Sequence, residues 1–277
     1  LIRLTPGSYV VDTLVQLLPH VHLEGAGEAA TRIRLQGMGQ LVFWGSGSAE
    51  EEVEIGSLTL ERDFPTSPLP AIENHQGHMT LSAVTIWGPP NMGGYAIHAE
   101  GGSGSMTLNH VTIDGAGVAI EGFDMPLRIE DSRIRNSEIG VMSANSMDVT
   151  IWNSEIDVDQ LGAMSQGALA IRGSRIRSLS GYGIESHAEL TLLNSTVDSQ
   201  SESAVHVAQG PARIDHSNLS SMFDSAVRVQ GPAVDTVYIG TTQLSGPGSK
   251  PAVAGPGAWK CIHVYDGKLD PLNSLCQ

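Results

Sequence analysis

Acidic and histidine side chains gather in two parts of the sequence, where their types would allow acid–base chemistry. The first group contains His98, Glu100 and Glu121. If these residues lie on neighbouring strands of a parallel stack, with strands about 4.8 Å apart and alternate residues about 6.6 Å apart, the two glutamates are roughly 8 Å from each other. Inverting glycoside hydrolysis uses two carboxyl groups about 6.5–9.5 Å apart, so Glu100 and Glu121 could supply its acid and its base. Phe123 could offer a sugar a flat platform. The alternative is a solvated outer face of an acidic protein.

The second group contains Glu185, His187, His206 and Arg228. A histidine base beside a guanidinium that neutralises a carboxylate could serve a β-elimination, and Glu185 with both histidines could instead hold a divalent metal. A ladder of compensating charges explains the same residues, so we expect no metal here. No cofactor is expected either: Ca²⁺ could bridge this acidic protein to an acidic glycan, but the sequence carries no specific calcium motif.

A repeat must position both groups. Seven segments align without gaps: MTLSAVTI from Met79, MTLNHVTI from Met106, LRIEDSRI from Leu127, VTIWNSEI from Val149, LAIRGSRI from Leu169, LTLLNSTV from Leu190 and ARIDHSNL from Ala212. Their starts differ by 27, 21, 22, 20, 21 and 22 residues, and VEIGSLTL from Val53 is an earlier copy. Short strands with period-2 alternation, bends at a fixed offset and no helical periodicity predict an all-β fold, a right-handed parallel β-helix (solenoid) with turns of about 21 residues.

The columns of this alignment give each position a role. Two aliphatic columns, which begin at Leu81 and Ile86, must face the core. Two residues after the first column stands a residue that tolerates a left-handed backbone, such as Asn153, which predicts one bend per turn. The next position is serine from Ser132 to Ser217 and predicts hydroxyl hydrogen bonds along the stack.

One outward column alternates in charge from rung to rung and has a structural explanation. Its members are Asp114, Arg135, Asp157, Arg177 and Asp198. Parallel stacking brings equivalent positions into contact, so alternating signs avoid repulsion between like charges. We therefore assign this face a structural role.

Three features carry a family resemblance: the opening LIRLTPGSYV, the segment VHLEGAGEAATRIRLQG from Val21 and the turn repeats. In these features the chain resembles the right-handed parallel β-helices of the pectate-lyase-like superfamily, over roughly residues 1 to 255. The resemblance implies a substrate in a groove beside a strand face. The fold serves lyases, hydrolases, esterases, epimerases and non-enzymatic adhesins, and the chain lacks the motif sets of polygalacturonases, alginate epimerases and pectate lyases. The expected face carries His98, Glu121, Glu185 and His206, with Phe123, Tyr95 and Tyr182 as rings for substrate binding.

The balance of charged residues limits the kinds of macromolecule that the protein is expected to bind. Fifteen Lys and Arg against thirty Asp and Glu give a net charge of −15, and such a surface repels nucleic acid and disfavours polyanionic sugars more than neutral ones. No apolar run is long enough to span a membrane. We expect an exported protein that engages a polysaccharide or a cell-surface glycan, as a polysaccharide hydrolase or lyase or, alternatively, as a non-catalytic adhesin or structural β-helix.

The sequence contains two cysteines, Cys261 and Cys276, 15 residues apart near its end. A disulfide there would stabilise the tail by about 3 kcal/mol in the chain-entropy model and would point to an extracellular or periplasmic location; two free thiols are the alternative.

We expect one domain over residues 1–277, with N-terminal turns or a cap at 1–50, regular turns at 51–257 and a disulfide-pinned cap at 258–277. Residues 11–18 could form a covering helix or a first strand. Because the chain opens at Leu1 with no signal peptide before it, we expect a processed or trimmed chain.

Overall fold

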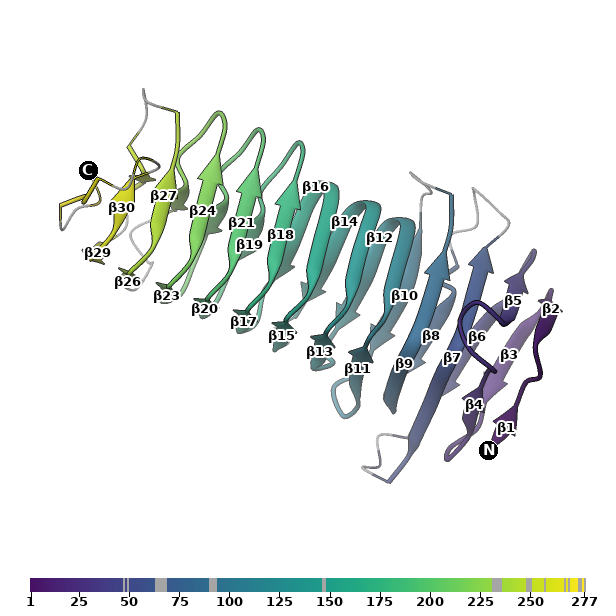
Figure 1. The fold of residues 1–277 in the computed structure, drawn as a ribbon. Helices are drawn as coiled ribbons and strands as arrows, with labels where there is room; N and C mark the ends of the chain where they lie inside the picture. The colour runs from purple at the N-terminus through teal and green to yellow at the C-terminus, as the bar shows by residue number, and fades with distance from the viewer. Residues whose placement is uncertain are drawn as a thin grey trace. The chain divides into compact units, whose positions relative to one another are not determined.

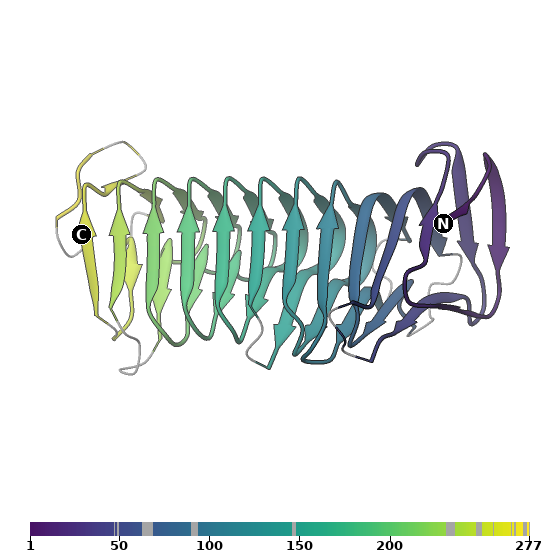
Figure 2. The same ribbon diagram turned by 90° about the horizontal axis from the view of Figure 1, so that it is seen from below.

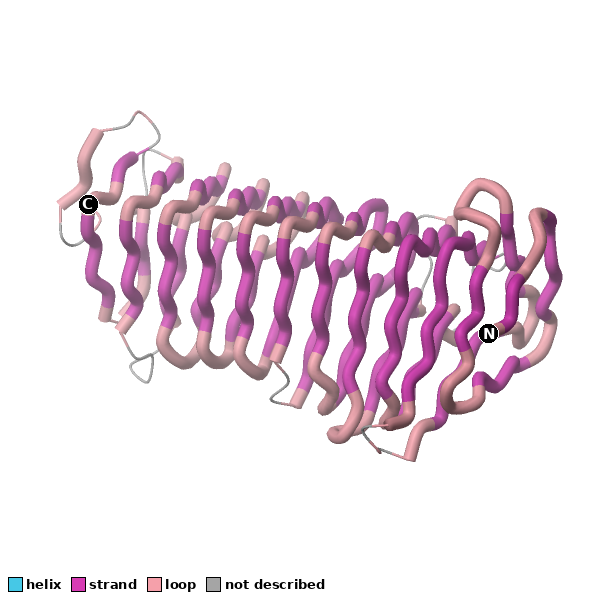
Figure 3. The backbone as a smooth tube through the Cα atoms, turned by 60° about the horizontal axis from the view of Figure 1, so that its bottom comes forward, coloured by secondary structure: helices cyan, strands magenta, loops and turns pink. Residues whose placement is uncertain are grey.

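The computed structural model describes residues 1–46, 48, 50–62, 69–89, 94–145, 148–230, 236–247, 251–256, 258–266, 268, 270–273 and 276. The chain divides into two compact units, Leu1–Met147 and Asp148–Gln277, called unit 1 and unit 2 below. Every regular element among the described residues is a β-strand, as the colouring of Figure 3 shows. This part of the chain accordingly contains no helix that could cross a membrane.

Unit 1 contains strands β1 to β14, labelled in Figure 1. Their bounds are β1 Ile2–Arg3, β2 Gly7–Val11, β3 Leu14–Leu17, β4 His22–Glu24, β5 Thr31–Leu35, β6 Gln40–Trp44, β7 Glu52–Arg62, β8 Ile72–His75, β9 His78–Trp87, β10 Tyr95–Glu100, β11 Ser105–Asn109, β12 Thr112–Phe123, β13 Leu127–Glu130 and β14 Arg133–Ala144. They pair in parallel in three stacks, because the chain returns to the same face once per turn. The stacks are β1-β4-β7-β9-β11-β13, β2-β5-β7-β9-β12-β14 and β3-β6-β8-β10-β12-β14.

Unit 2 repeats this arrangement with strands β15 to β30, whose arrows run side by side in Figure 2. Their bounds are β15 Val149–Trp152, β16 Glu155–Ser165, β17 Leu169–Arg172, β18 Arg175–Ser178, β19 Ile184–Ser186, β20 Leu190–Leu193, β21 Thr196–Ser199, β22 Val205–Val207, β23 Ala212–Asp215, β24 Asn218–Ser221, β25 Val227–Val229, β26 Val237–Gly240, β27 Gln243–Ser245, β28 Val253–Ala254, β29 Trp259–Ile262 and β30 Tyr265–Asp266. The parallel stacks are β15-β17-β20-β23-β26-β29, β16-β18-β21-β24-β27-β30 and β16-β19-β22-β25-β28.

The two aliphatic columns form the core, as the alignment predicts. Side chains of the first column, Leu81, Leu108, Ile129, Ile151, Ile171, Leu192 and Ile214, are at most 1% exposed. Burying each such side chain contributes about 1.5–3 kcal/mol to stability, so each rung adds a similar amount of free energy to the core. From β11 to β24, paired residues within each unit are 20 to 22 positions apart, close to the predicted turn of about 21.

The predicted bend occurs on every one of these rungs. All seven residues of the column have a left-handed backbone, with φ between 46° and 62°: Ala83, His110, Asp131, Asn153, Gly173, Asn194 and His216. Asn, Asp and Gly tolerate this conformation at little cost, and this tolerance accounts for their repetition in the sequence. The bend turns the chain between the first and second stack of each unit.

The predicted serine ladder follows the bend. In unit 2 the backbone N–H of Ser154 donates to the Ser174 hydroxyl at 3.1 Å, and that of Ser174 donates to the Ser195 hydroxyl at 3.2 Å. Each hydroxyl in turn donates to the carbonyl two residues earlier, as Ser195 does to Leu193 at 2.8 Å. These bonds satisfy buried backbone groups that the tight bend removes from strand pairing.

The alternating charge column also pairs within each unit. Arg135 Nη2 lies 2.8 Å from Asp114 Oδ2 in unit 1, and Arg177 Nη1 lies 3.9 Å from Asp157 Oδ2 in unit 2. The opposite charges on neighbouring rungs therefore compensate each other, as expected of a structural ladder.

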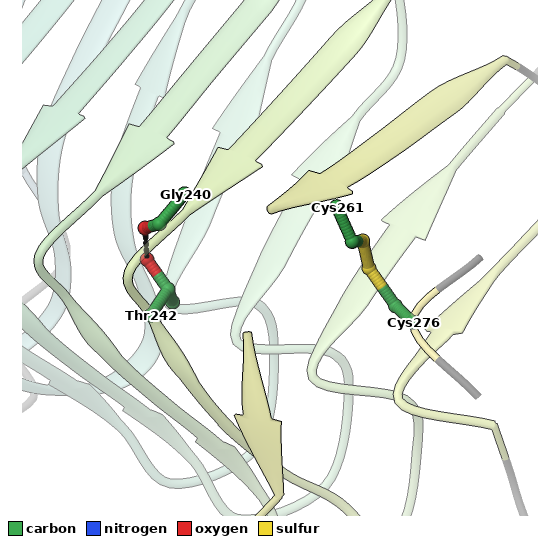
Figure 4. The surroundings of a disulfide bond; sticks show 4 residues. All are labelled: Gly240, Thr242, Cys261 and Cys276. Atoms are coloured by element: carbon green, nitrogen blue, oxygen red, sulfur yellow. Dashed lines mark hydrogen bonds between the residues drawn. A yellow bond between two sulfur atoms is a disulfide. The ribbon is translucent and has the colours of Figure 1, made fainter. Parts of the chain in front are cut away.

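The structure answers two questions about the ends of the chain: whether residues 11–18 are helix or strand, and whether the two cysteines are bonded. Residues 11–18 contribute to β2 and β3, so this segment is strand and not helix. Cys261 and Cys276 form the expected disulfide (Figure 4), with Cα atoms 5.7 Å apart. Strand β29 pairs with β26 and places Cys261 beside Ile239, so the ladder continues past residue 257, where we expected the cap to begin.

Removal of one ladder hydroxyl tests how the turns are held. Ser195→Ala deletes the acceptor of the Ser174 N–H and leaves this buried group without a partner, which we expect to lower the free energy of unfolding by about 1–3 kcal/mol. Chemical denaturation measures the change. Ser180→Ala is the control, because its hydroxyl also donates to a backbone carbonyl but at an exposed position, and its loss should stay below about 0.5 kcal/mol. Equal losses in both variants would contradict the role of the ladder.

Candidate functional site

The first predicted group lies on the third stack of unit 1. Strands β8, β10 and β12 pair so that Glu73, His98 and Glu121 form one column. The neighbouring column holds His75, then Glu100, then Phe123, two residues further along the same strands. Ile97 and Ile120, which directly precede His98 and Glu121, point to the core and are fully buried, so the strand alternation directs the acids and imidazoles to the outer side.

These side chains form one continuous chain of contacts. His75 Nε2 lies 3.0 Å from Glu73 Oε1 and its Nδ1 lies 2.6 Å from Glu100 Oε1. His98 Nε2 lies 3.5 Å from Glu100 Oε2 and its Nδ1 lies 3.0 Å from Glu121 Oε2. Three carboxylates thus alternate with two imidazoles, and each imidazole contacts a carboxylate through both of its nitrogens.

The alternation fixes which kinds of group meet along this row. A carboxylate only accepts hydrogen bonds, whereas an imidazole nitrogen can carry an N–H that donates. Each carboxylate of the row therefore faces an imidazole nitrogen and not another carboxylate.

Glu121 is the buried member of the chain. The residue is only 5% exposed, whereas the side chain of Glu100 in the same group is 48% exposed. Burial raises the pKa of the Tyr95 phenol, and the charge of Glu121 and the hydrogen bond that Tyr95 donates to it raise this pKa further. Glu121 therefore orients both the His98 ring and the Tyr95 hydroxyl.

The spacing between Glu100 and Glu121 is occupied. The sequence predicts two carboxyl groups on either side of an open gap, where an inverting hydrolase would place water. In the structure the two nitrogens of His98 contact these two carboxylates, so the imidazole fills the gap. The pair could flank a glycosidic bond only after His98 moved away.

Aromatic rings border the chain of contacts. The ring centroids of Phe123 and Tyr95 lie 5.7 Å and 5.6 Å from that of His98. At the other end, the Trp44 ring centroid lies 6.0 Å from that of His75, and Trp44 is 48% exposed. We call Trp44, Glu73, His75, Tyr95, His98, Glu100, Glu121 and Phe123 together the unit 1 face.

Three members of this face, Trp44, Glu73 and His75, are not among the residues predicted from the sequence. The turn before β8 is long, with Leu41 pairing 31 positions away with Ile72, so the 21-residue repeat did not reach them. A local signal was present: Ala71-Ile72-Glu73 has the same form as Ala96-Ile97-His98 and Ala119-Ile120-Glu121. An alignment on this triplet would have added β8 to the face.

The second predicted group lies on the third stack of unit 2. Strands β19, β22 and β25 bring Glu185, His206 and Arg228 into one column, as predicted. Glu185 Oε1 lies 3.1 Å from His187 Nε2 and 3.5 Å from His206 Nδ1. Arg228 differs from the expectation, because its Nη1 lies 3.7 Å from Asp224 Oδ2 and the guanidinium is thereby paired with an acid outside the predicted group.

His206 is the buried member of this second group. It is 4% exposed, and among the described residues neither of its ring nitrogens has a hydrogen-bond partner. Tyr182 covers it, with ring centroids 4.5 Å apart, so Tyr182 packs on the imidazole. The contact with His206, and the positive charges of His206 and His187, hold the pKa of the Glu185 carboxyl below its ordinary value, while burial opposes this effect.

The described residues contain no group of three or more His, Cys, Asp and Glu side chains arranged to hold a metal ion. Glu185, His187 and His206, which the sequence suggested as alternative metal ligands, are thus close together without forming such a group. The chemistry that both clusters offer in the described part of the chain is that of carboxylates, imidazoles and phenols.

The right handed beta helix region family matches residues 71–220, which is more than half of the chain. The chain therefore belongs to the right-handed β-helix family, in agreement with the parallel stacks and with the resemblance seen in the sequence. Comparison with curated proteins gives no match.

Two solved structures with different roles share the fold. The A-module of mannuronan C-5 epimerase AlgE6 from Azotobacter vinelandii superimposes with a TM-score of 0.61 at 14% identity, over 95% of this chain and 84% of that chain. PfbA, a surface adhesin of Streptococcus pneumoniae, superimposes with a TM-score of 0.56 at 9% identity, over 98% of this chain and 87% of that chain. At such identities the likeness extends to the fold alone.

The low pKa of Glu185 gives a prediction. A carboxyl group whose pKa is depressed in the folded state stabilises the fold above its unfolded pKa of about 4.3 and loses this contribution as pH falls through the folded pKa. His206→Gln removes the first cause of the depression, so the pKa of Glu185 should rise toward its ordinary value. Carbon-13 NMR titration of the Glu185 carboxyl measures it. His216→Gln, which removes an exposed imidazole beside Asp215, should leave the value unchanged, and an unchanged value in His206→Gln would refute the assignment.

Proposed function

We propose that this protein engages carbohydrate on the unit 1 face and that the glycan is neutral. The observation that carries the proposal is the unbroken row of carboxylates and imidazoles between the Trp44 and Phe123 rings. Sugars present hydroxyl groups, which both donate and accept hydrogen bonds, and an apolar C–H surface, which packs on aromatic rings. Both nitrogens of each imidazole already contact a carboxylate, but the carboxylate oxygens keep further lone pairs that can accept hydrogen bonds from sugar hydroxyls. The aromatic rings beside them are complementary to the C–H surface.

The charge of the protein supports a neutral glycan. The unit 1 face carries three glutamates and no arginine or lysine, in a chain with a net charge of −15. An acidic polysaccharide would meet repulsion at long range and carboxylates at close range. A neutral chain meets neither, and its hydroxyls can bond to the same carboxylates.

The geometry supports binding more than catalysis. Inverting hydrolysis needs the gap that His98 fills, and β-elimination acts beside a carboxylate of the substrate, which the charged face disfavours. The two proteins with this fold, one named as an epimerase module and one as a surface adhesin, support either kind of role. A protein of this kind acts outside the cytoplasm, extracellular or periplasmic, and the Cys261–Cys276 disulfide supports that location.

Aromatic truncation tests binding. Phe123→Ala and Trp44→Ala each remove a ring at one end of the row, and each should weaken retention on a neutral polysaccharide by at least about tenfold, because ring stacking supplies apolar contact to the sugar. Affinity electrophoresis in gels that contain single polysaccharides measures the retention. Tyr238→Ala is the control, since Tyr238 is 52% exposed and lies on β26 of unit 2. Loss of retention in Tyr238→Ala alone, or in none of the three variants, would refute the proposed face.

Catalysis by a hydrolase or lyase is the second candidate, and one observation favours it: buried Glu121 orients both His98 and Tyr95. In this case Glu121→Gln should abolish turnover, because the amide cannot hold a proton for the imidazole, while the melting temperature stays nearly unchanged. Reducing-sugar release and absorbance at 235 nm, measured across neutral and acidic polysaccharides, detect hydrolysis and elimination separately. Turnover that survives in Glu121→Gln would remove Glu121 from any mechanism, and no turnover by the unaltered protein would leave binding as the function.

A further inference from the structure

A hollow of about 500 Å³ lies on unit 2, over strands that carry none of the residues discussed so far as candidates. Arg175 and Arg177 of β18, Asp198 of β21 and Ser220 of β24 line it. The strand register places Arg177, Asp198 and Ser220 in one outward column. Part of the charge ladder to which we assigned a structural role therefore lines this hollow.

The guanidinium groups in this hollow are loosely held. Arg175 Nη2 lies 3.9 Å from Asp198 Oδ2, and Arg177 Nη1 lies 3.9 Å from Asp157 Oδ2. Both distances exceed the 2.7–3.2 Å or so of a hydrogen bond, in contrast to the 2.8 Å contact of Arg135 with Asp114 in unit 1. The N–H groups of both arginines can therefore donate to a ligand, and Asp198, which accepts a hydrogen bond from Ser220 through Oδ1, keeps Oδ2 as an acceptor.

The wall of the hollow is fixed by the backbone. The hydroxyl of Ser199 donates to the carbonyl of Gly181 at 2.7 Å, and that of Ser221 donates to the carbonyl of Glu202 at 2.7 Å. The hydroxyl protons of Ser199 and Ser221 are therefore already donated to backbone carbonyls of the turns. Beyond them, Met222 lines the rim and is 59% exposed, and the adjacent Phe223 is 63% exposed, so an apolar edge stands beside the polar floor.

We propose that this hollow binds a neutral sugar residue. Asp198 lines the hollow with the two arginines, and Asp157, which is not part of the lining, lies 3.9 Å from Arg177, so two nearby carboxylates balance the two guanidinium charges. Adjacent donors and acceptors match the neighbouring hydroxyls of a sugar, and the apolar rim matches its C–H surface. The site is separate from the unit 1 face, and its existence does not depend on the function proposed there.

Nitrogen-15 NMR of the arginine side chains tests this site in the full chain. D-glucose, D-galactose, D-mannose and N-acetyl-D-glucosamine are titrated separately while the Nε–Hε signals of Arg175 and Arg177 are followed. At least one sugar should shift both signals saturably, and Arg175→Gln should weaken its binding by at least about tenfold, because one donor group of the site is lost. Arg213→Gln is the matched control, since Arg213 is similarly exposed and lies 3.6 Å from Asp215 without lining the hollow; its effect should stay within about twofold.

Three outcomes would overturn the proposal: no saturable shift with any of the four sugars, equal weakening in Arg175→Gln and Arg213→Gln, or tighter binding of D-glucuronate than of every neutral sugar. The last result would identify an anion site. Phe123→Ala in unit 1 should leave these shifts unchanged, so a failure here and a failure of the unit 1 face can be told apart.

Discussion

The return of the chain to the same strand position once per turn is the constraint on which the fold and both candidate sites depend. Each residue then contacts its counterpart on the neighbouring rung, and a slip by one residue would move every core side chain to the outer side. The left-handed bend at positions such as Asn153 and Asn194, with the hydroxyl of the serine that follows, holds the register where strand pairing is interrupted. Backbone conformation and one repeated hydrogen bond therefore help to fix the strand register, which decides which residues share an outward column.

The same register creates the chemistry of the outer faces. Identical charged residues would stack into columns of like charge, and two columns avoid this by alternating: acid with imidazole in Glu73, His98 and Glu121 of unit 1, and acid with arginine in Asp157, Arg177 and Asp198 of unit 2. Where the alternating partners are close, as around His98, they hold one another and bury Glu121. Where they are loose, as at Arg175, they leave donors open to a ligand. One rule of charge compensation thus produces a connected network in unit 1 and an open polar hollow in unit 2.

The sequence was sufficient for the fold because the fold is periodic. The bend column, the serine ladder and the aliphatic columns follow from residue types at fixed offsets, and each is observed. The disulfide was inferred separately, from two cysteines near the end of the chain, and it too is observed. The site was predicted only in part. The registers of His98 with Glu121 and of Glu185 with His206 follow from the repeat, but side-chain rotation does not, so the sequence could not show that His98 fills the gap between two carboxylates or that Arg228 turns to Asp224. Trp44 and His75 were not predicted because the turn that separates their strands, β6 and β8, is longer than the period.

The most direct test of the central claim, that a neutral glycan lies on the unit 1 face, is a measurement of nuclear Overhauser effects between aromatic ring protons and sugar C–H protons. The ligand is an oligosaccharide cut from whichever neutral polysaccharide retains the protein. The account predicts effects from the sugar to the rings of Trp44 and Phe123, which border the row of carboxylates and imidazoles. Effects that reach other exposed rings, such as Trp87 and Tyr238, and never these two would contradict it.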